Sequence, residues 1–172
     1  MRPRAGSQLP AVFAVALLVA MAAVACRGGG TNNKAATRAT APTATSVDPA
    51  ARYLALANRA NEAADRFNTA AARLQTRTVT QAQLATEAAT FATALDDMNK
   101  GLATGVWPPK VAALVPDLIA ANKKVIADLQ RTGTVPAPEL VAWNHQLALD
   151  EGAFTEVATR IRLALRLPPA EA

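Results

Sequence analysis

Two segments of this 172-residue chain carry apolar residues at alternating steps of three and four, the spacing of a helix that packs along one side. In the first segment these residues are Tyr53, Leu56, Ala60, Ala63, Phe67, Ala70 and Leu74. In the second they are Leu84, Ala88, Phe91, Leu95, Met98 and Leu102. The pattern predicts two long amphipathic helices, over about 49–77 and 80–104, and no alternating run indicates a strand.

Residues at the ends of these segments are typical helix boundaries. Asp48 followed by Pro49 suits the start of the first helix, and Thr80 with Gln83 forms a capping-box sequence at the start of the second. Gly105 and the prolines 108 and 109 end the second helix.

Two further amphipathic helices are expected, over about 109–131 and 138–167. Pro116 lies in the second turn of the third helix, where a proline either kinks a helix or delays its start. The fourth helix has an apolar side formed by Leu140, Trp143, Leu147, Phe154, Val157, Ile161 and Ala164. Short connections between four long helices predict an all-α fold, an up-down-up-down four-helix bundle.

The N-terminus reads as an export signal. Arg2 and Arg4 precede an unbroken apolar run over 11–25, and small residues lead into Cys26, the single cysteine of the chain. The run is shorter than the roughly 20 residues of a membrane-spanning helix. Ala23-Val24-Ala25-Cys26 resembles the lipobox of bacterial lipoproteins, with alanine where that family usually has leucine. The resemblance implies cleavage before Cys26 and a diacylglyceryl anchor on its sulfur.

The same residues leave a second possibility open. Ala23-Val24-Ala25 also satisfies the A-x-A rule of ordinary signal peptidase, which would release a protein with a free N-terminal thiol. Residues 26–47 are rich in Thr, Ala and Gly and offer few large apolar side chains, so we expect a flexible linker there. The predicted organisation is a signal peptide over 1–25, the lipidated cysteine and linker over 26–47, the helical domain over 48–169, and a tail over 170–172.

The sequence offers little material for chemistry. His145 is the single histidine and lies off the apolar side of its helix, so we expect an ordinary surface residue, and no metal site or cofactor is predicted. No nucleophile stands beside a base in a recognisable motif. Without Arg2 and Arg4 the chain has 16 basic and 13 acidic residues, a net charge of +3, which does not indicate nucleic-acid binding. We therefore expect a protein that is not an enzyme.

Asp150 interrupts the apolar side of the fourth helix, between Leu147 and Phe154, and Asn122 has a comparable place on the third. A buried charge must be paired or hydrogen-bonded. These residues could form a ligand-binding polar layer or a buried polar pair that fixes helix register. In a third interpretation the helix turns so that Ala148 or Glu151 takes the buried position.

Four arginines recur every seven residues along one flank of the first helix: Arg52, Arg59, Arg66 and Arg73. They could form a basic face for anionic lipid or an acidic partner. The simpler interpretation is that they pair with nearby acids, among them Glu62, Asp65 and Glu87, and cover the alanine-rich seam with their stems.

Trp107-Pro108-Pro109 with Val111, Val115 and Leu118, and the terminal stretch 162–169, resemble segments of small alanine-rich helical lipoproteins of high-GC bacteria, mostly actinobacteria. The resemblance supports lipidation and a helical domain and carries over no active-site residue. The leading hypothesis is a lipid-anchored, extracytoplasmic, non-catalytic binding or structural module of the cell envelope, held in the membrane through Cys26, with an envelope protein as its candidate partner. The alternative is a small-molecule carrier with a ligand near Asp150 and Asn122. The oligomeric state stays open.

Overall fold

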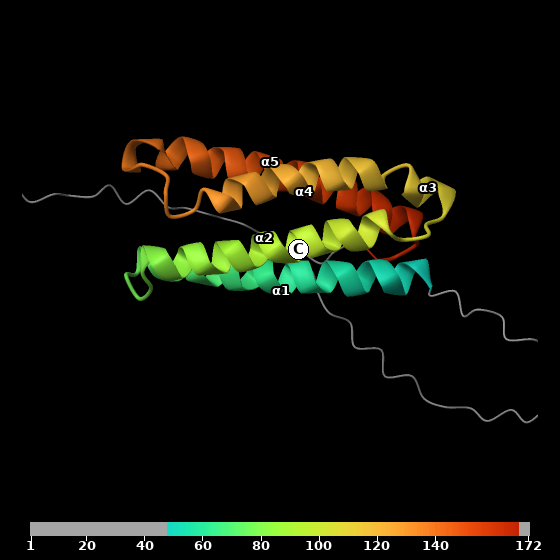
Figure 1. The fold of residues 1–172 in the computed structure, drawn as a ribbon, viewed down its shortest axis with the longest axis horizontal. Helices are drawn as coiled ribbons and strands as arrows, with labels where there is room; N and C mark the ends of the chain where they lie inside the picture. The colour runs from blue at the N-terminus through green and yellow to red at the C-terminus, as the bar shows by residue number, and fades with distance from the viewer. Residues whose placement is uncertain (1–47, 169–172) are drawn as a thin grey trace, which may run out of the picture.

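The computed structural model describes residues 48–168, and within this range it is all-helical, as predicted (Figure 1). Four long helices are joined by short connections, one of which contains the four-residue helix α3 and another a 3₁₀ turn. The elements are α1 (Pro49–Gln75), α2 (Gln81–Ala103), α3 (Pro109–Ala112), α4 (Val115–Gln130), η1 (Ala137–Glu139) and α5 (Leu140–Ala164). The predicted signal peptide, Cys26, the linker and the tail lie outside the described residues.

The predicted helix starts are confirmed by hydrogen bonds. The Asp48 side chain accepts from the backbone N–H of Ala50 at 3.1 Å. Thr80 and Gln83 form both bonds of the capping box, of which the bond from the Thr80 N–H to Gln83 Oε1 measures 2.7 Å. Each cap satisfies backbone donors that have no partner inside the helix.

The third predicted helix is divided in two. Pro116 has no N–H to donate to residue 112, and its ring would collide with that carbonyl inside a continuous helix. The chain therefore leaves the helix after α3, and α4 begins at Val115 with Pro116 in its first turn. This is the late start that the proline allowed.

The fourth helix is shorter than predicted, because it begins after the 3₁₀ turn and ends at Ala164. Arg166 there adopts a left-handed conformation, with φ 57°. The N–H groups of Leu167 and Arg166 then donate to the carbonyls of Arg162 and Leu163 at 2.9 and 3.1 Å. This pair of bonds is a Schellman motif, which closes the helix end ahead of Pro168.

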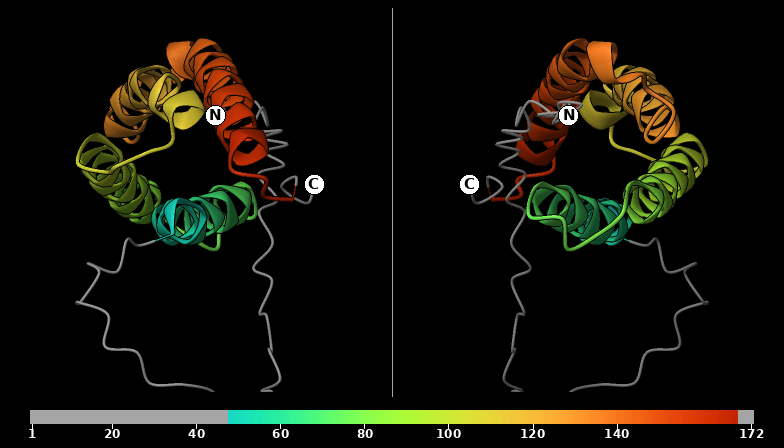
Figure 2. Two further views of the ribbon diagram at one scale, coloured as in Figure 1. Left: turned by 90° about the vertical axis from the view of Figure 1, so that its right-hand side faces the viewer. Right: turned by 90° about the vertical axis from the view of Figure 1, so that its left-hand side faces the viewer.

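The long helices lie side by side, with the α1–α2 and α4–α5 connections at one end of the molecule and α3 at the other (Figure 1). Figure 2 looks along the helices and shows them around a common centre. Helices α1 and α2, α2 and α4, and α4 and α5 pack against each other along their lengths. The backbones of α1 and α5 approach each other less closely, although side chains of both line the same small cavities.

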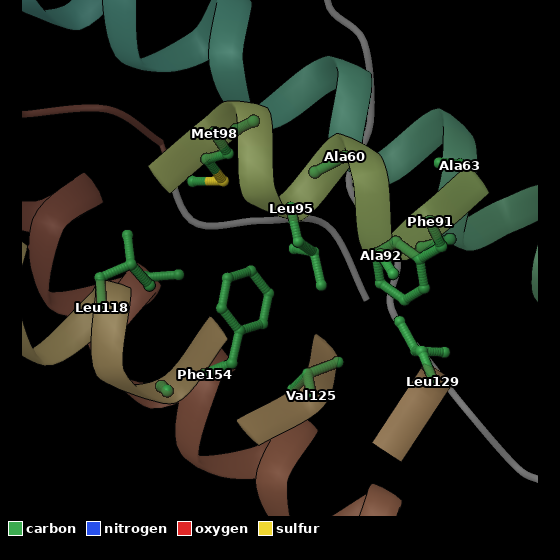
Figure 3. Close-up of a cluster of buried hydrophobic side chains, with 14 of the residues drawn as sticks. Ala60, Ala63, Phe91, Ala92, Leu95, Met98, Leu118, Val125, Leu129 and Phe154 are labelled. Carbon is green, nitrogen blue, oxygen red and sulfur yellow. The ribbon is translucent and has the colours of Figure 1, made fainter. Parts of the chain in front are cut away.

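The predicted apolar positions form the core. All six residues of the α2 seam are buried, and five of the seven on α1 are buried, with Leu56 and Leu74 partly covered. The rings of Phe67 and Phe91 lie 6.2 Å apart between their centres. In Figure 3, Leu95 of α2, Val125 of α4 and Phe154 of α5 point toward one another. Over residues 48–168, the structure has no helix that is both long and apolar enough to cross a membrane.

Candidate functional site

The polar interruption predicted on the last helix is larger than expected, because Asp150 and Glu151 are both buried. Asp150 is 9% exposed and Glu151 5%, whereas Ala148 is exposed. The two carboxyl groups follow each other in the chain and lie on either side of the line from Leu147 to Phe154. The core side of α5 therefore contains two acidic residues, whereas the sequence interpretations treated Asp150 and Glu151 as alternatives for one buried position.

Asp150 is held at the edge of the core by two polar neighbours. Gln146, one turn earlier on α5, donates to Asp150 Oδ2 at 2.7 Å, and the exposed Lys124 ammonium lies 4.0 Å from Oδ1. These contacts supply the partners that a buried carboxylate needs. These two contacts therefore account for the burial of the Asp150 carboxylate, and no bound ligand is needed to explain it.

Asp128 of α4 lies beside Asp150 and is itself buried. Burial raises the pKa of the Asp128 carboxyl, and its hydrogen bond with Asp150 and the charge of Asp150 raise the pKa further, while Arg131 lowers it. Because two adjacent carboxylates repel each other, a proton on Asp128 stabilises the pair. The backbone carbonyl of Asp128 also accepts from Trp143 Nε1 at 3.0 Å, which joins α4 to α5 at this level.

Glu151 has no such support. Both carboxylate oxygens are buried and neither has a hydrogen-bond partner among the described residues. Burial, and secondarily the charge of Asp128, raise the pKa of Glu151 to about 8. The side chain borders a cavity of about 10 Å³ lined by residues of all four long helices, among them Phe91, Phe154 and Asn61.

Asn122 is fully buried, but it does not join Asp150. Its amide nitrogen donates to Asn99 Oδ1 of α2 at 2.7 Å, and its own carbonyl oxygen has no partner among the described residues. The buried pair therefore links α2 to α4, as a register-fixing pair would, whereas Asp150 is bonded within α5 and to α4. The sequence interpretation that placed Asp150 and Asn122 in one polar layer is not reproduced by their contacts.

Glu151 was one of the two residues that the third sequence interpretation named as able to take the buried position, and it is buried together with Asp150. Four other buried polar residues were not singled out from the sequence: Asn99, Asp128, Thr132 and Arg162. Three of them, Asn99, Asp128 and Arg162, directly follow or precede a residue of the apolar pattern, namely Met98, Leu129 and Ile161. A wider buried strip, one residue broader than the heptad line, would have included them.

Two cavities between the helices are small. The cavity beside Glu151 has a volume of about 10 Å³, and a second, between α1 and α5 near Trp143, has about 20 Å³. Ligand pockets usually measure roughly 300–1,000 Å³. The larger hollows, each of about 440 Å³, are open depressions on the outer face of α1 and α2.

These two hollows lie along the arginine stripe. One is bordered by Arg59 and Arg66 with Glu62 and Asp97, and the other by Arg66 and Arg73 with Glu87. Arg66 lies 3.6 Å from Glu87, so the pairing interpretation holds for this residue. The described residues provide no ion pair for Arg59 or Arg73.

Arg52, the first arginine of the stripe, stabilises the fold by joining α1 to the end of α2. Its guanidinium group donates to the carbonyl oxygen of Gly101 at 3.3 Å, near the end of α2, and lies 5.8 Å from the centre of the Trp107 ring. Trp107 Nε1 donates to the carbonyl oxygen of Leu102 at 2.8 Å. The Trp107 loop therefore closes the end of α2, and of its apolar residues Val106 is the one left exposed, at 88%.

The remaining sequence predictions concern His145, metal binding and Cys26. His145 is exposed, as expected. Within 48–168, no group of three or more His, Cys, Asp or Glu side chains could hold a metal ion. Cys26 lies outside the described residues, so its lipidation stays a prediction. No protein-family model matches the chain, and neither a curated protein nor a solved structure shows significant similarity to it.

Proposed function

We propose that this protein is a lipid-anchored, extracytoplasmic, non-catalytic module of the cell envelope that binds a partner or serves a structural role. The observation that carries the proposal is the position of Cys26, the single cysteine, directly after the apolar run over 11–25 that we interpret as an export signal. Two acyl chains on this residue would hold the protein stably at the membrane. The predicted linker over 26–47 would then separate the domain from the lipid surface.

The helical domain is proposed to be an up-down-up-down bundle. The supporting contacts come from opposite ends of successive helices: Arg52 near the start of α1 meets Gly101 near the end of α2, and Trp143 near the start of α5 meets Asp128 near the end of α4. In such a bundle the helices pack around a shared core and their outer faces are available to a partner.

The outer face of α1 and α2 is the proposed binding surface. It carries both large hollows, and its exposed arginines 59 and 73 are without an ionic partner within 48–168. A polar partner with acidic groups would complement these two charges. The tightly filled core favours this role over the alternative, a carrier for an elongated apolar ligand, because the interior cavities are far smaller than such a ligand.

The anchor is tested by measuring the intact mass of the mature protein from membrane and medium fractions. We expect a membrane-bound species that carries diacylglyceryl mass and is lost in Cys26→Ala. An unmodified species in the medium that begins at Cys26 would overturn the anchor and leave a secreted protein.

The binding surface is tested by cross-linking in intact cells. Arg59→Glu with Arg73→Glu should remove a specific cross-linked envelope protein, while Arg160→Glu, an exposed arginine on α5, should keep it. Identical cross-links in both variants would exclude the α1–α2 face.

A further inference from the structure

Helix α5 is apolar on its outer side as well as on its core side. Four large apolar side chains are exposed in the described part of the chain, and three of them belong to α5: Val141 is 58% exposed, Leu149 55% and Leu163 65%. At the exposed positions of this helix, the charged residues are Glu156 and Arg160. A helix that is apolar on all sides is usually covered on all sides, and exposed apolar patches often mark interaction surfaces. The outer side of α5 is therefore a candidate contact with another molecule.

The apolar pattern on this outer side is arranged symmetrically about Gly152. Val141 lies eleven residues before Gly152, and Leu163 lies eleven residues after it. Eleven residues make about three helix turns, so the three positions share one line along α5. This line has a large apolar residue near each end and a glycine at its centre. It therefore presents the same features when it is followed in either direction.

The domain itself does not require a glycine at position 152. Glycine inside a helix is less favourable than alanine. A Cβ atom added to Gly152 would meet nothing within 4 Å, and Gly133 is the described glycine with a positive φ. Neither the packing nor the backbone therefore explains Gly152. A residue without a side chain does allow a second backbone to approach closely.

We propose that two copies of this chain pair through the outer side of α5, with the helices antiparallel around a two-fold axis at Gly152. Each Val141 then meets Leu163 of the other copy, and the two Gly152 residues meet at the axis. A two-fold contact uses the same patch on both molecules, so the patch must match itself when reversed. The symmetric line on α5 meets this requirement, whereas an unrelated partner would not need it.

The charges on α5 are compatible with this pairing. Glu156 faces the level of Ala148 of the second copy, and Arg160 faces the level of Asn144, so charges of the same sign are not opposed. His145 of the second copy lies three residues, about 4.5 Å, along the helix from the level of Glu156. The Glu156 carboxylate can therefore accept a hydrogen bond from that imidazole. Such complementary groups favour one orientation of a pair over others.

The proposal depends neither on the anchor at Cys26 nor on an envelope partner. It is tested on the purified full chain with Cys26→Ala, which removes the single native thiol. A contact between one pair of helices is small, so we expect a reversible dimer whose fraction rises with protein concentration in analytical ultracentrifugation. Leu163→Glu should weaken dimerisation at least about tenfold, because each dimer would bury two charged groups in place of two leucines. Val106→Glu is the matched control, since it introduces the same charge at an exposed apolar residue outside α5 and should leave the dimer unchanged.

Disulfide formation tests the position of the axis. Two helices with axes about 10 Å apart place facing Cα atoms roughly 5–6 Å apart, a separation that a disulfide can bridge. Oxidised Gly152→Cys should therefore form a covalent dimer. The two copies of position 148 lie eight residues, about 12 Å, apart along an antiparallel pair, which is too far for a disulfide. Ala148→Cys, exposed on the same side of α5, should therefore stay unlinked.

The remaining outcomes would overturn the proposal. A monomer at every concentration would show that a second copy does not cover α5. A dimer as strong in Leu163→Glu as in the parent chain would place the contact elsewhere. Cross-linking of Ala148→Cys as readily as Gly152→Cys would indicate parallel helices, and a Gly152→Cys chain that dimerises without cross-linking would exclude the axis at this residue.

Discussion

Replacing Glu151 by glutamine should change how the stability of the protein depends on pH. The pKa of Glu151 is about 8 in the folded protein and 4.5 in the unfolded chain, mainly because burial disfavours the charged form. The folded state therefore binds more protons between these values. It follows that the contribution of Glu151 to the free energy of unfolding is fully present below about pH 4.5, falls as the pH rises toward about 8, and is lost above it.

The size of this loss follows from the same two values. Each pH unit of difference corresponds to about 1.36 kcal/mol. The interval from 4.5 to about 8 therefore gives roughly 5 kcal/mol, an upper limit because local rearrangement would lower the cost of the buried charge. Glutamine is never charged, so Glu151→Gln should match the wild type near about pH 4 and exceed its stability by up to roughly 5 kcal/mol near about pH 9.

The assay is urea denaturation of the wild type and of Glu151→Gln at a series of pH values, in sodium chloride. The exposed Glu156→Gln is the matched control and should follow the wild-type curve. Asp128 also has a raised pKa and contributes a slope of the same sign in all three proteins, so the difference between the curves reports the charge of Glu151 together with its coupling to Asp128. A constant difference between wild type and Glu151→Gln across this pH range would refute the reasoning.

Four further substitutions test the fold. Phe67→Ala should cost about 3–5 kcal/mol, because the ring is 2% exposed and packs on α2, and an unchanged melting temperature would show that this seam is not the core. Gly152→Ala should gain about 0.5–1 kcal/mol, since an added methyl group meets nothing within 4 Å, while Gly133→Ala should be destabilising because its φ is 88°; thermal denaturation of the pair checks both signs. Asn99→Ala should cost about 1–3 kcal/mol by leaving the buried Asn122 amide without its acceptor, and full stability in urea denaturation would contradict this bond.

Much of the fold could be predicted because the information is local. The alternating steps of three and four identified every buried residue of α2 except Ala92 and Asn99, and the caps at Asp48 and Thr80 lie where their side chains indicate. Pro116 is a local signal too, because its effect depends on the residue four places before it. Its two possible outcomes could be named in advance, but the choice between them depends on how the preceding turn packs on α5.

The polar site could be predicted only in part, because its chemistry comes from several helices. Asp150 stood out because it breaks a pattern within one helix. Glu151 was named only as an alternative to Asp150, and the sequence did not indicate that both would be buried. Asp128 did not stand out, since it lies next to the apolar line of its helix and is buried where α4 packs against α5. The pairing of Asn122 with Asn99 likewise depends on the register of α2 and α4, which the sequence leaves open.

The alanines of α1 connect the packing to the buried charge. Ala60, Ala63 and Ala64 carry small side chains on the core side of α1, whereas Tyr53 and Phe67 stand before and after them. Small residues leave space wherever the opposite helix does not move in, and α5 does not approach α1 closely. Glu151 borders the cavity at the level of Ala60 and Ala64, so the unpartnered carboxyl and the free volume coincide. A larger apolar residue at either alanine would close the cavity and still leave the Glu151 carboxyl without a partner, so the protonated form of Glu151 is the one that the folded state favours.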